Sequence, residues 1–246
     1  MEKIATMSYY YTNFLNENNK DYIDFVTGCL KELGLDVRKF LKNRGSHESG
    51  ACKDKELLLK QLREELGDCR RCELYKTRKN IVFGVGNPCS KIMFIGEAPG
   101  EEEDLKGEPF VGRAGKLLDK LLESIGLSRN ENVYIANVLK SRPPDNKISQ
   151  CLDSIPICLP FLLKQIEIIK PKIICCLGSV AFNSLLKRNE QITKVRGTFY
   201  EFNGIKLLPT YHPSYLLRNP IAKKEVWEDF KKLKIMLERL EEEENV

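Results

Sequence analysis

Residues 96–115 read GEAPGEEEDLKGEPFVGRAG, and this stretch decides how the chain folds. An apolar run at 91–95 leads into it, and a helix is expected to start at Arg113. Its five glycines are costly to order, and glycine lets the backbone approach a ligand closely. A buried strand that ends in such a loop is typical of a sheet whose C-terminal edge holds a ligand. The alternative is an ordinary strand-to-helix connection that is acidic.

Short apolar runs alternate with helical segments through the rest of the chain. Three near-continuous apolar runs indicate parallel strands buried on both faces, and a fourth run completes the sheet. The pattern predicts a three-layer α/β/α sandwich around a short, mostly parallel four-stranded sheet, with its ligand site outside the strand C-termini. Strands are expected at 91–95, 133–139, 172–177 and 205–209, and helices at 113–125, 154–169, 179–186 and 222–240.

The N-terminal part has a different pattern. Helical periodicity is present at 22–33 and 55–66, and a polar, breaker-rich linker at 43–53 separates the two. Gly67 is expected to stop the second helix. We therefore expect a helical, variable leader at 1–66 and the main domain at 67–246.

Composition narrows the class of protein. The 246 residues carry a net charge of +5, which is compatible with nucleic acid binding without being diagnostic of it. No apolar stretch approaches the roughly 20 residues of a membrane helix, and residues 1–20 lack a signal-peptide core. We expect a cytoplasmic monomer that does not engage membranes.

Chemically capable side chains follow three of the predicted strands. Glu97, Glu103 and Phe110 follow the first strand, Asn137 lies in the second, and His212 follows the fourth. Phe110 offers a face for a planar ligand, Asn137 can match an imide edge, and His212 can donate to a developing oxyanion. Each residue alone has a structural explanation, as core aromatic, turn amide or turn histidine. Their shared place at the strand ends favours a nucleobase pocket.

The nine cysteines suggest a metal site and buried thiols rather than a disulfide framework. Cys69 and Cys72 form a CxxC pair, which alone is consistent with zinc, a redox pair or chance. Its position before the sheet weakens the redox interpretation. Cys158 is the best further ligand and Cys151 the next. No ligand role is assigned to Cys29, Cys52, Cys89, Cys175 or Cys176, the last two being expected core thiols.

From about Gly67 to about Leu237 the chain resembles the family 4 uracil-DNA glycosylases, the iron–sulfur-containing branch of their superfamily. The motifs that carry the resemblance are Cys69-x-x-Cys72, the 96–115 stretch, Asn137-Val-Leu-Lys140 leading to Arg142-Pro-Pro, Cys158-x-Pro160, Leu177-Gly178, Arg196-Gly197 and His212-Pro-Ser-x-x-Leu217-Arg218.

The resemblance implies a role for each pocket residue. Phe110 would stack on an extruded uracil, Asn137 would read its Watson–Crick edge, and His212 would hydrogen-bond O2. Glu103 matches the position that crowds the C5 side and rejects thymine. Glu97 belongs to the first catalytic motif. Ala98 lines the uracil site where family 1 enzymes have a water-positioning aspartate, so either Glu97 or Glu103 is a candidate base.

The resemblance also implies contacts with DNA. Leu216 would be the wedge that fills the gap left in the base stack, and Arg218 would hold backbone phosphate. Arg113 and Ser214 complete the expected DNA-binding set. The partner would be uracil-containing DNA, single- or double-stranded.

A 4Fe-4S cluster is the cofactor that the resemblance implies, and one ligand departs from the pattern. Family members have Cys-Arg-Pro-Pro where this chain has Ser141-Arg-Pro-Pro. Cys69, Cys72 and Cys158 would hold the cluster with a fourth ligand from either Ser141 or Cys151, or the cluster would be incomplete.

The expected activity is hydrolysis of the N-glycosidic bond of uracil in DNA, which leaves an abasic site for base excision repair. The alternatives are a non-catalytic nucleic-acid-binding relative, a relative acting on another deaminated base, and a cluster-based redox protein.

Overall fold

The computed structural model describes residues 48–244, of which 49–244 lie within one compact unit. The helix expected at 22–33 lies outside the described residues, as does the rest of the segment 1–47.

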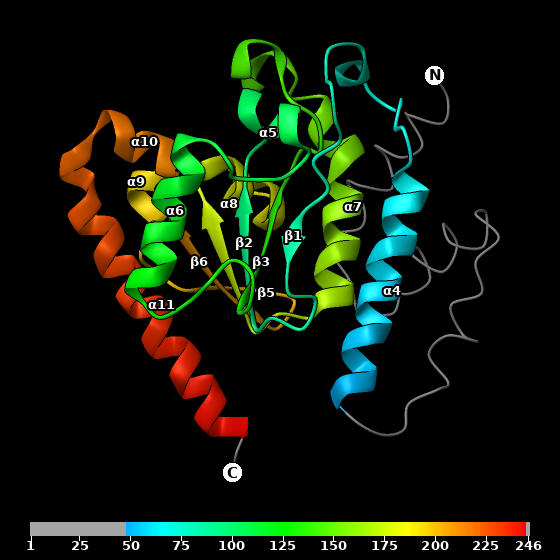
Figure 1. Ribbon diagram of the computed structural model, residues 1–246. Coiled ribbons are helices and arrows are strands. Elements are labelled where there is room, and N and C mark those ends of the chain that lie inside the picture. Colours follow the sequence, from blue (N-terminus) through cyan, green and yellow to red (C-terminus); the bar gives the residue numbers. More distant parts are fainter. Residues whose placement is uncertain (1–47, 245–246) are drawn as a thin grey trace. The chain divides into compact units, whose positions relative to one another are not determined.

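A six-stranded sheet with the order β1-β3-β2-β4-β6-β5 forms the centre of this unit (Figure 1). The four predicted strands are confirmed and run parallel to one another. Two further strands pair antiparallel at the edges, so the expected count of four was too low. The strands are β1 (Val85–Gly86), β2 (Ile92–Gly96), β3 (Val133–Asn137), β4 (Ile173–Leu177), β5 (Tyr200–Phe202) and β6 (Ile205–Thr210).

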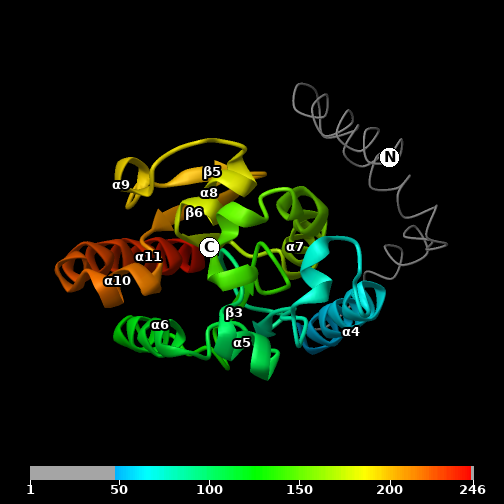
Figure 2. The same ribbon diagram turned by 90° about the horizontal axis from the view of Figure 1, so that it is seen from above.

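Helices cover both faces of the sheet, which confirms the three-layer sandwich (Figures 1 and 2). Alternate residues of β2 serve the two layers: Met93 and Ile95 pack in one core cluster, Ile92 and Phe94 in the other. Full burial on both faces explains why the strand lacks polar alternation. One cluster includes α4 (Glu48–Leu66), α7 (Ser154–Ile169) and α8 (Ser179–Leu186), and the other includes α6 (Arg113–Ser124), α10 (Pro213–Arg218) and α11 (Lys223–Glu244).

Short helices complete the chain. α5 (Glu101–Lys106) follows β2 at the edge of the sheet where the predicted site residues lie (Figure 1). The others are α9 (Ile192–Val195) and the 3-10 helices η1 (Glu73–Lys76), η2 (Pro144–Asn146), η3 (Ile148–Gln150) and η4 (Pro220–Ala222).

Helix α4 differs from the sequence prediction. It begins at Glu48, so residues 48–53 are helical rather than part of a linker. Its Leu59, Leu62 and Leu66 are buried in the same core cluster as the sheet. The compact unit thus starts upstream of the boundary expected at residue 66.

A disulfide joins Cys52 of α4 to Cys89 in the loop before β2, with 5.6 Å between the Cα atoms. The sequence analysis assigned no ligand role to either cysteine. The pair ties α4 covalently to the loop before β2.

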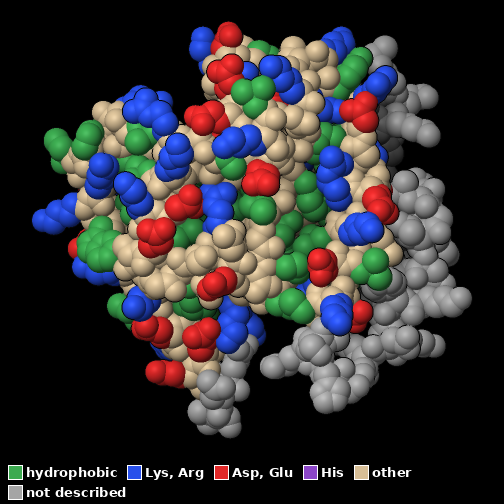
Figure 3. Space-filling model, in the orientation of Figure 1, with side chains coloured by type: hydrophobic (Ala, Val, Ile, Leu, Met, Phe, Trp, Pro, Cys, Tyr) green, Lys and Arg blue, Asp and Glu red, His purple; other side chains and the backbone are tan. Residues whose placement is uncertain are grey.

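The surface of the unit mixes charges of both signs. Figure 3 shows basic and acidic side chains interspersed over the face in view. Among the helices of the segment 48–244, none has the length and apolar character needed to cross a bilayer.

Candidate active site

The ends of β2 and β3 bring Asn137 and Phe110 together over a glycine. Gly96 pairs with Asn137 in the parallel register. A Cβ on Gly96 would lie 2.4 Å from Asn137 Oδ1 and 2.5 Å from Phe110 Cζ. Only a residue without a side chain leaves room for both groups. The site therefore depends on the glycine that begins the 96–115 stretch.

Asn137 is 1% exposed, yet its Oδ1 has no hydrogen-bond partner among the described residues. A buried acceptor without a partner costs about 1–3 kcal/mol, which a fold sustains when a ligand supplies the missing donor. This oxygen and the ring of Phe110 both lie against Gly96 at the end of β2. It is placed to accept a hydrogen bond from the edge of a planar ligand.

His212 is held in one tautomer by its position at the start of α10. Its Nδ1 accepts the backbone N–H of Ser214 at 3.1 Å, and Ser214 Oγ lies 2.8 Å from the same atom. The proton of the neutral ring is therefore on Nε2. Burial lowers the pKa of His212 to about 4, with Arg218 lowering it further and Glu103 opposing both. At neutral pH the ring is an uncharged Nε2–H donor.

The ring of Phe110 stands beside His212, with 5.5 Å between ring centroids and 33° between planes. Phe110 has a left-handed backbone with φ of 54° and is 5% exposed. A non-glycine residue in that region is strained and is held by its surroundings.

Glu103 holds the loop that carries Phe110. Its Oε1 accepts the backbone N–H groups of Val111 at 2.9 Å and Gly112 at 2.8 Å. Its Oε2 accepts the N–H of Gly100 at 3.1 Å. Both carboxylate oxygens are thus occupied by the backbone, which makes Glu103 unsuited to act as a general base. Its predicted contact with the C5 side of a base stays a prediction.

Glu97 has the opposite environment. The side chain is half-buried, and burial raises the pKa of its carboxyl group. No hydrogen bond or ion pair engages this carboxyl group within residues 48–244, while its backbone carbonyl accepts from Leu139 N at 3.0 Å. Ala98, also half-buried, follows it. Of the two candidate bases, Glu97 is the one with a free carboxyl group.

Helix α10 corrects one predicted DNA contact. Leu216 is fully buried in the core cluster with α6 and α11, so it cannot be the exposed wedge. The next residue, Leu217, is 38% exposed. Arg218 and Arg113 are exposed, as phosphate contacts require. The hydroxyl of Ser214 already contacts His212.

Three cysteines from two distant parts of the sequence line one small pocket. Cys69, Cys72 and Cys158 share it with Ser141, which is 7% exposed. Cys151 does not line it, and its thiol donates to Ile148 O at 3.4 Å. The structure thus brings the three predicted cysteines together with Ser141 rather than Cys151.

Hydrogen-bond donors surround these sulfur atoms. Arg71 Nη1 lies 3.3 Å from Cys69 Sγ, and the backbone N–H of Lys140 donates to Cys158 Sγ at 3.2 Å. Burial raises the pKa of the Cys158 thiol to about 11, with Lys140 lowering it and the two other cysteines raising it. Across the described chain, no three His, Cys, Asp or Glu side chains are close enough to hold a single metal ion.

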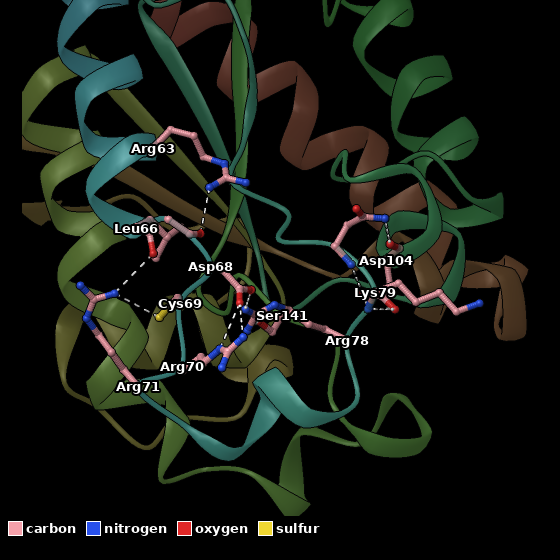
Figure 4. Close-up of polar contacts among 12 residues, drawn as sticks. Arg63, Leu66, Asp68, Cys69, Arg70, Arg71, Arg78, Lys79, Asp104 and Ser141 are labelled. Atoms are coloured by element: carbon pink, nitrogen blue, oxygen red, sulfur yellow. Dashed lines mark hydrogen bonds and ion pairs between the residues drawn. The ribbon is translucent and has the colours of Figure 1, made fainter.

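Two acidic residues that the sequence left unassigned hold the loop after Cys72 (Figure 4). Arg78 donates to Asp68 at 2.8 Å and to Ser141 Oγ at 3.3 Å. Asp104 of α5 is 2% exposed, and its Oδ1 accepts the N–H groups of Lys79 and Asn80 at 2.9 and 3.2 Å. The sequence signal for Asp104 was its place in the run 101–104, which does not show which carboxylates turn inward.

Known proteins resemble this chain over most of its length. A family model described as the uracil DNA glycosylase superfamily matches residues 83–231. The type-4 uracil-DNA glycosylase of Saccharolobus solfataricus is 51% identical over 180 residues, covering 70% of this chain and 82% of that protein. The type-4 enzyme of Archaeoglobus fulgidus is 46% identical over 177 residues, covering 69% and 88%. That of Thermotoga maritima is 44% identical over 189 residues, covering 75% and 97%.

Proposed function

Because this chain belongs to the uracil-DNA glycosylase superfamily, we propose that it hydrolyses the N-glycosidic bond of uracil in DNA and leaves an abasic site. The observation that carries the proposal is the buried, unpartnered Oδ1 of Asn137 beside the ring of Phe110. An acceptor in that position matches the N3–H of uracil.

The pocket residues act on a base that has left the stack, since the reacting bond is out of reach inside a duplex. Phe110 supports the plane of the base, and Asn137 Oδ1 accepts its N3–H. The Nε2–H of neutral His212 donates to O2, where negative charge collects as the bond to the sugar breaks. A donor fixed before the reaction stabilises that charge without reorganisation. Uracil then departs as an anion.

We assign to Glu97 the task of positioning the water that attacks the sugar. The sugar develops oxocarbenium character, and a carboxylate positions the attacking water in related glycosidic hydrolyses. The assignment is supported because the Glu97 carboxyl group has no hydrogen bond or ion pair within residues 48–244, whereas that of Glu103 accepts three backbone N–H groups.

DNA contacts are assigned to exposed residues at two helix ends. Arg113 at the start of α6 and Arg218 at the end of α10 would bind phosphates, which need no sequence readout. Leu217, rather than the buried Leu216, would fill the gap in the stack. Use of single- or double-stranded DNA, a monomeric state and a cytoplasmic location stay predictions.

We assign an iron–sulfur cluster to the cysteine pocket, which is lined by Cys69, Cys72, Cys158 and Ser141. Three thiols and a hydroxyl converge there, and N–H groups point at two of the sulfurs, a surrounding typical of cluster ligands. A cluster bridges ligands that stand farther apart than those of one ion. Cys69, Cys72 and Cys158 would hold a 4Fe-4S cluster with Ser141 at the fourth iron. Because hydrolysis needs no redox step, the role of the cluster would be structural. It would fix the loop after Cys72 beside the nucleobase pocket.

The cluster assignment has its own test. Ser141→Cys restores a thiolate beside the other three ligands. We expect higher iron and sulfide content per chain, and slower loss of visible absorbance in air, than in the unchanged protein. Cys151→Ser is the control and should change neither quantity. If instead Cys151→Ser loses iron and sulfide and Ser141→Cys gains none, the fourth ligand would be Cys151.

The activity itself is tested with a uracil-containing oligonucleotide, by measuring abasic sites after incubation with the protein. His212→Ala should lower the single-turnover rate by about 10²–10³, the usual cost of losing one oxyanion donor. Asn137→Ala, which removes the acceptor for N3–H, should lower that rate as well. Arg239→Gln on the exposed face of α11 is the matched control. Absence of uracil release from iron-replete, unchanged protein would reject the proposal and direct the search to other deaminated bases.

A further inference from the structure

We infer that Arg129, together with Asp119, is a positioning residue that sets the ring of Phe110 against the flipped base. The inference rests on the proposed function, because it assigns a residue to the stacking step of that reaction. Arg129 lies in the loop after α6, outside every motif that the sequence analysis used.

The guanidinium group of Arg129 binds two consecutive carbonyl groups of the loop that carries Phe110. Nη1 donates to Pro109 O at 3.1 Å, and Nη2 donates to Phe110 O at 2.5 Å. Nε donates to Asp119 Oδ1 of α6 at 2.8 Å. The rigid fork of arginine suits this arrangement, which a lysine cannot reproduce.

Glu103 binds the same loop through its backbone N–H groups, whereas Arg129 binds its carbonyl groups. Carboxylate oxygens accept the N–H groups of Val111 and Gly112, while the arginine donates to the carbonyls of residues 109 and 110. Opposite charges thus bind opposite ends of four successive residues. Phe110 sits between them with its strained φ of 54°, a conformation that requires such external restraint.

Burial supports a specific function for the pair. The side chain of Arg129 is 17% exposed, and that of Asp119 is 36% exposed. Ordering a long side chain costs conformational entropy that a surface ion pair seldom repays. The gain here is fixation of two carbonyl groups, Pro109 O and Phe110 O, and with them the backbone from which the aromatic ring projects. Loss of the fork should let the ring tilt, which weakens binding of the base and leaves DNA backbone contacts unchanged.

The test separates base binding from DNA binding. We measure three quantities for Arg129→Gln: the dissociation constant of free uracil, the single-turnover rate on uracil-containing DNA, and the affinity for an oligonucleotide with a tetrahydrofuran abasic site. Free uracil should bind about tenfold more weakly, and the rate should fall by about ten- to a hundredfold, since misplacement by about 1 Å costs up to about 10² in rate. Affinity for the abasic oligonucleotide should stay within about twofold of the unchanged protein, since it has no base to stack.

Graded variants keep the inference testable if Arg129→Gln folds poorly. Arg129→Lys retains the charge and at most part of the fork, and Asp119→Asn retains both carbonyl bonds but weakens the anchor. Both should show intermediate uracil binding, whereas Arg239→Gln, which removes an exposed pair on α11, should match the unchanged protein.

The outcomes distinguish the two proposals. If the unchanged protein excises uracil, and Arg129→Gln binds uracil and excises it just as well, the inference is overturned while the proposed function stands. Parallel loss of uracil and abasic DNA binding would show a general structural role and overturn it as well. Failure of the unchanged protein to excise or bind uracil would overturn the proposed function, and the inference with it.

Discussion

At the scale of single residues, His212 controls how activity depends on pH. Its ring is neutral above a pKa of about 4, against 6.5 for an ordinary histidine. The ring thus stays neutral, with Nδ1 accepting from Ser214 and Nε2–H as the donor, from pH 8 down through pH 5.5. We predict that the single-turnover rate shows no loss centred on pH 6.5, and that NMR titration of the ring gives a midpoint near 4.

The same shift has a consequence for stability. Between pH 6.5 and 4 the unfolded chain binds a proton at this position and the folded chain does not. The contribution of His212 to stability is therefore complete above pH 6.5 and is lost as pH falls toward 4. The chain has two histidines, so His47→Ala leaves a single ring signal to follow. A midpoint near 6.5 in that variant would show that the ring is solvated and can be charged during the reaction.

Residue chemistry was predictable where one side chain type suits one task. Asn137, Phe110 and His212 were identified from what an amide, an aromatic ring and an imidazole can do at strand ends, and the structure brings them together. The choice between Leu216 and Leu217 was not predictable in that way. It depends on the rotation of α10 against α6 and α11, which no local pattern of six residues specifies.

At the scale of elements, α5 shows how one acidic run serves two loops. Glu103 binds the loop that carries Phe110, while the neighbouring Asp104 binds the loop that follows Cys72. The short helix thus connects the base pocket with the cysteine pocket. The sequence indicated acidity and a ligand nearby, but neighbouring carboxylates with different partners require the three-dimensional arrangement.

Helix α6 provides the element-scale prediction, because it starts where the carbonyl of Phe110 lies. A Cβ on Gly115 would stand 1.8 Å from Phe110 O. In an open helix, Gly→Ala stabilises by about 0.5–1 kcal/mol. Here we predict the reverse: Gly115→Ala lowers the melting temperature, and it weakens free-uracil binding because the Phe110 loop must move away.

The neighbouring Ala114→Gly is the matched control, since it removes a methyl group from the same turn. It should cost only the helix propensity and leave uracil binding intact. The prediction is contradicted if Gly115→Ala is more stable than the unchanged protein and binds uracil normally. The loop that carries Phe110 would then shift without moving the aromatic ring. Thermal unfolding and uracil titration measure both quantities in one preparation.

At the scale of the whole molecule, the predictable part of the fold was the buried part. The parallel strands have continuous apolar runs because both faces are covered, and α7 and α8 begin and end where the sequence placed them. The edge strands β1 and β5 have two and three residues, too few for a periodic pattern. The boundary near residue 66 was inferred from Gly67, which ends α4 but does not separate it from the sheet.

The place of α4 leads to a prediction about the folding unit. Leu59, Leu62 and Leu66 are 7%, 4% and 2% exposed, and each such burial contributes about 1.5–3 kcal/mol. Their sum, about 5–9 kcal/mol, is comparable with the 5–15 kcal/mol that stabilises a typical domain. A chain that begins at Gly67 should therefore be poorly soluble or unfolded, although it contains every residue assigned to the two pockets.

A chain that begins at Glu48 is the informative comparison, because it retains α4 and its contacts. These include the ion pair between Glu65 and Lys164 at 3.0 Å and the bond from Lys55 Nζ to Ile169 O at 2.8 Å. We predict a melting temperature and an excision rate close to those of the full chain. Equal stability of the two shortened chains would show that α4 only rests on the sheet, and would restore residue 67 as the start of the domain. A large loss in the chain from Glu48 would instead make residues 1–47 part of the folding unit.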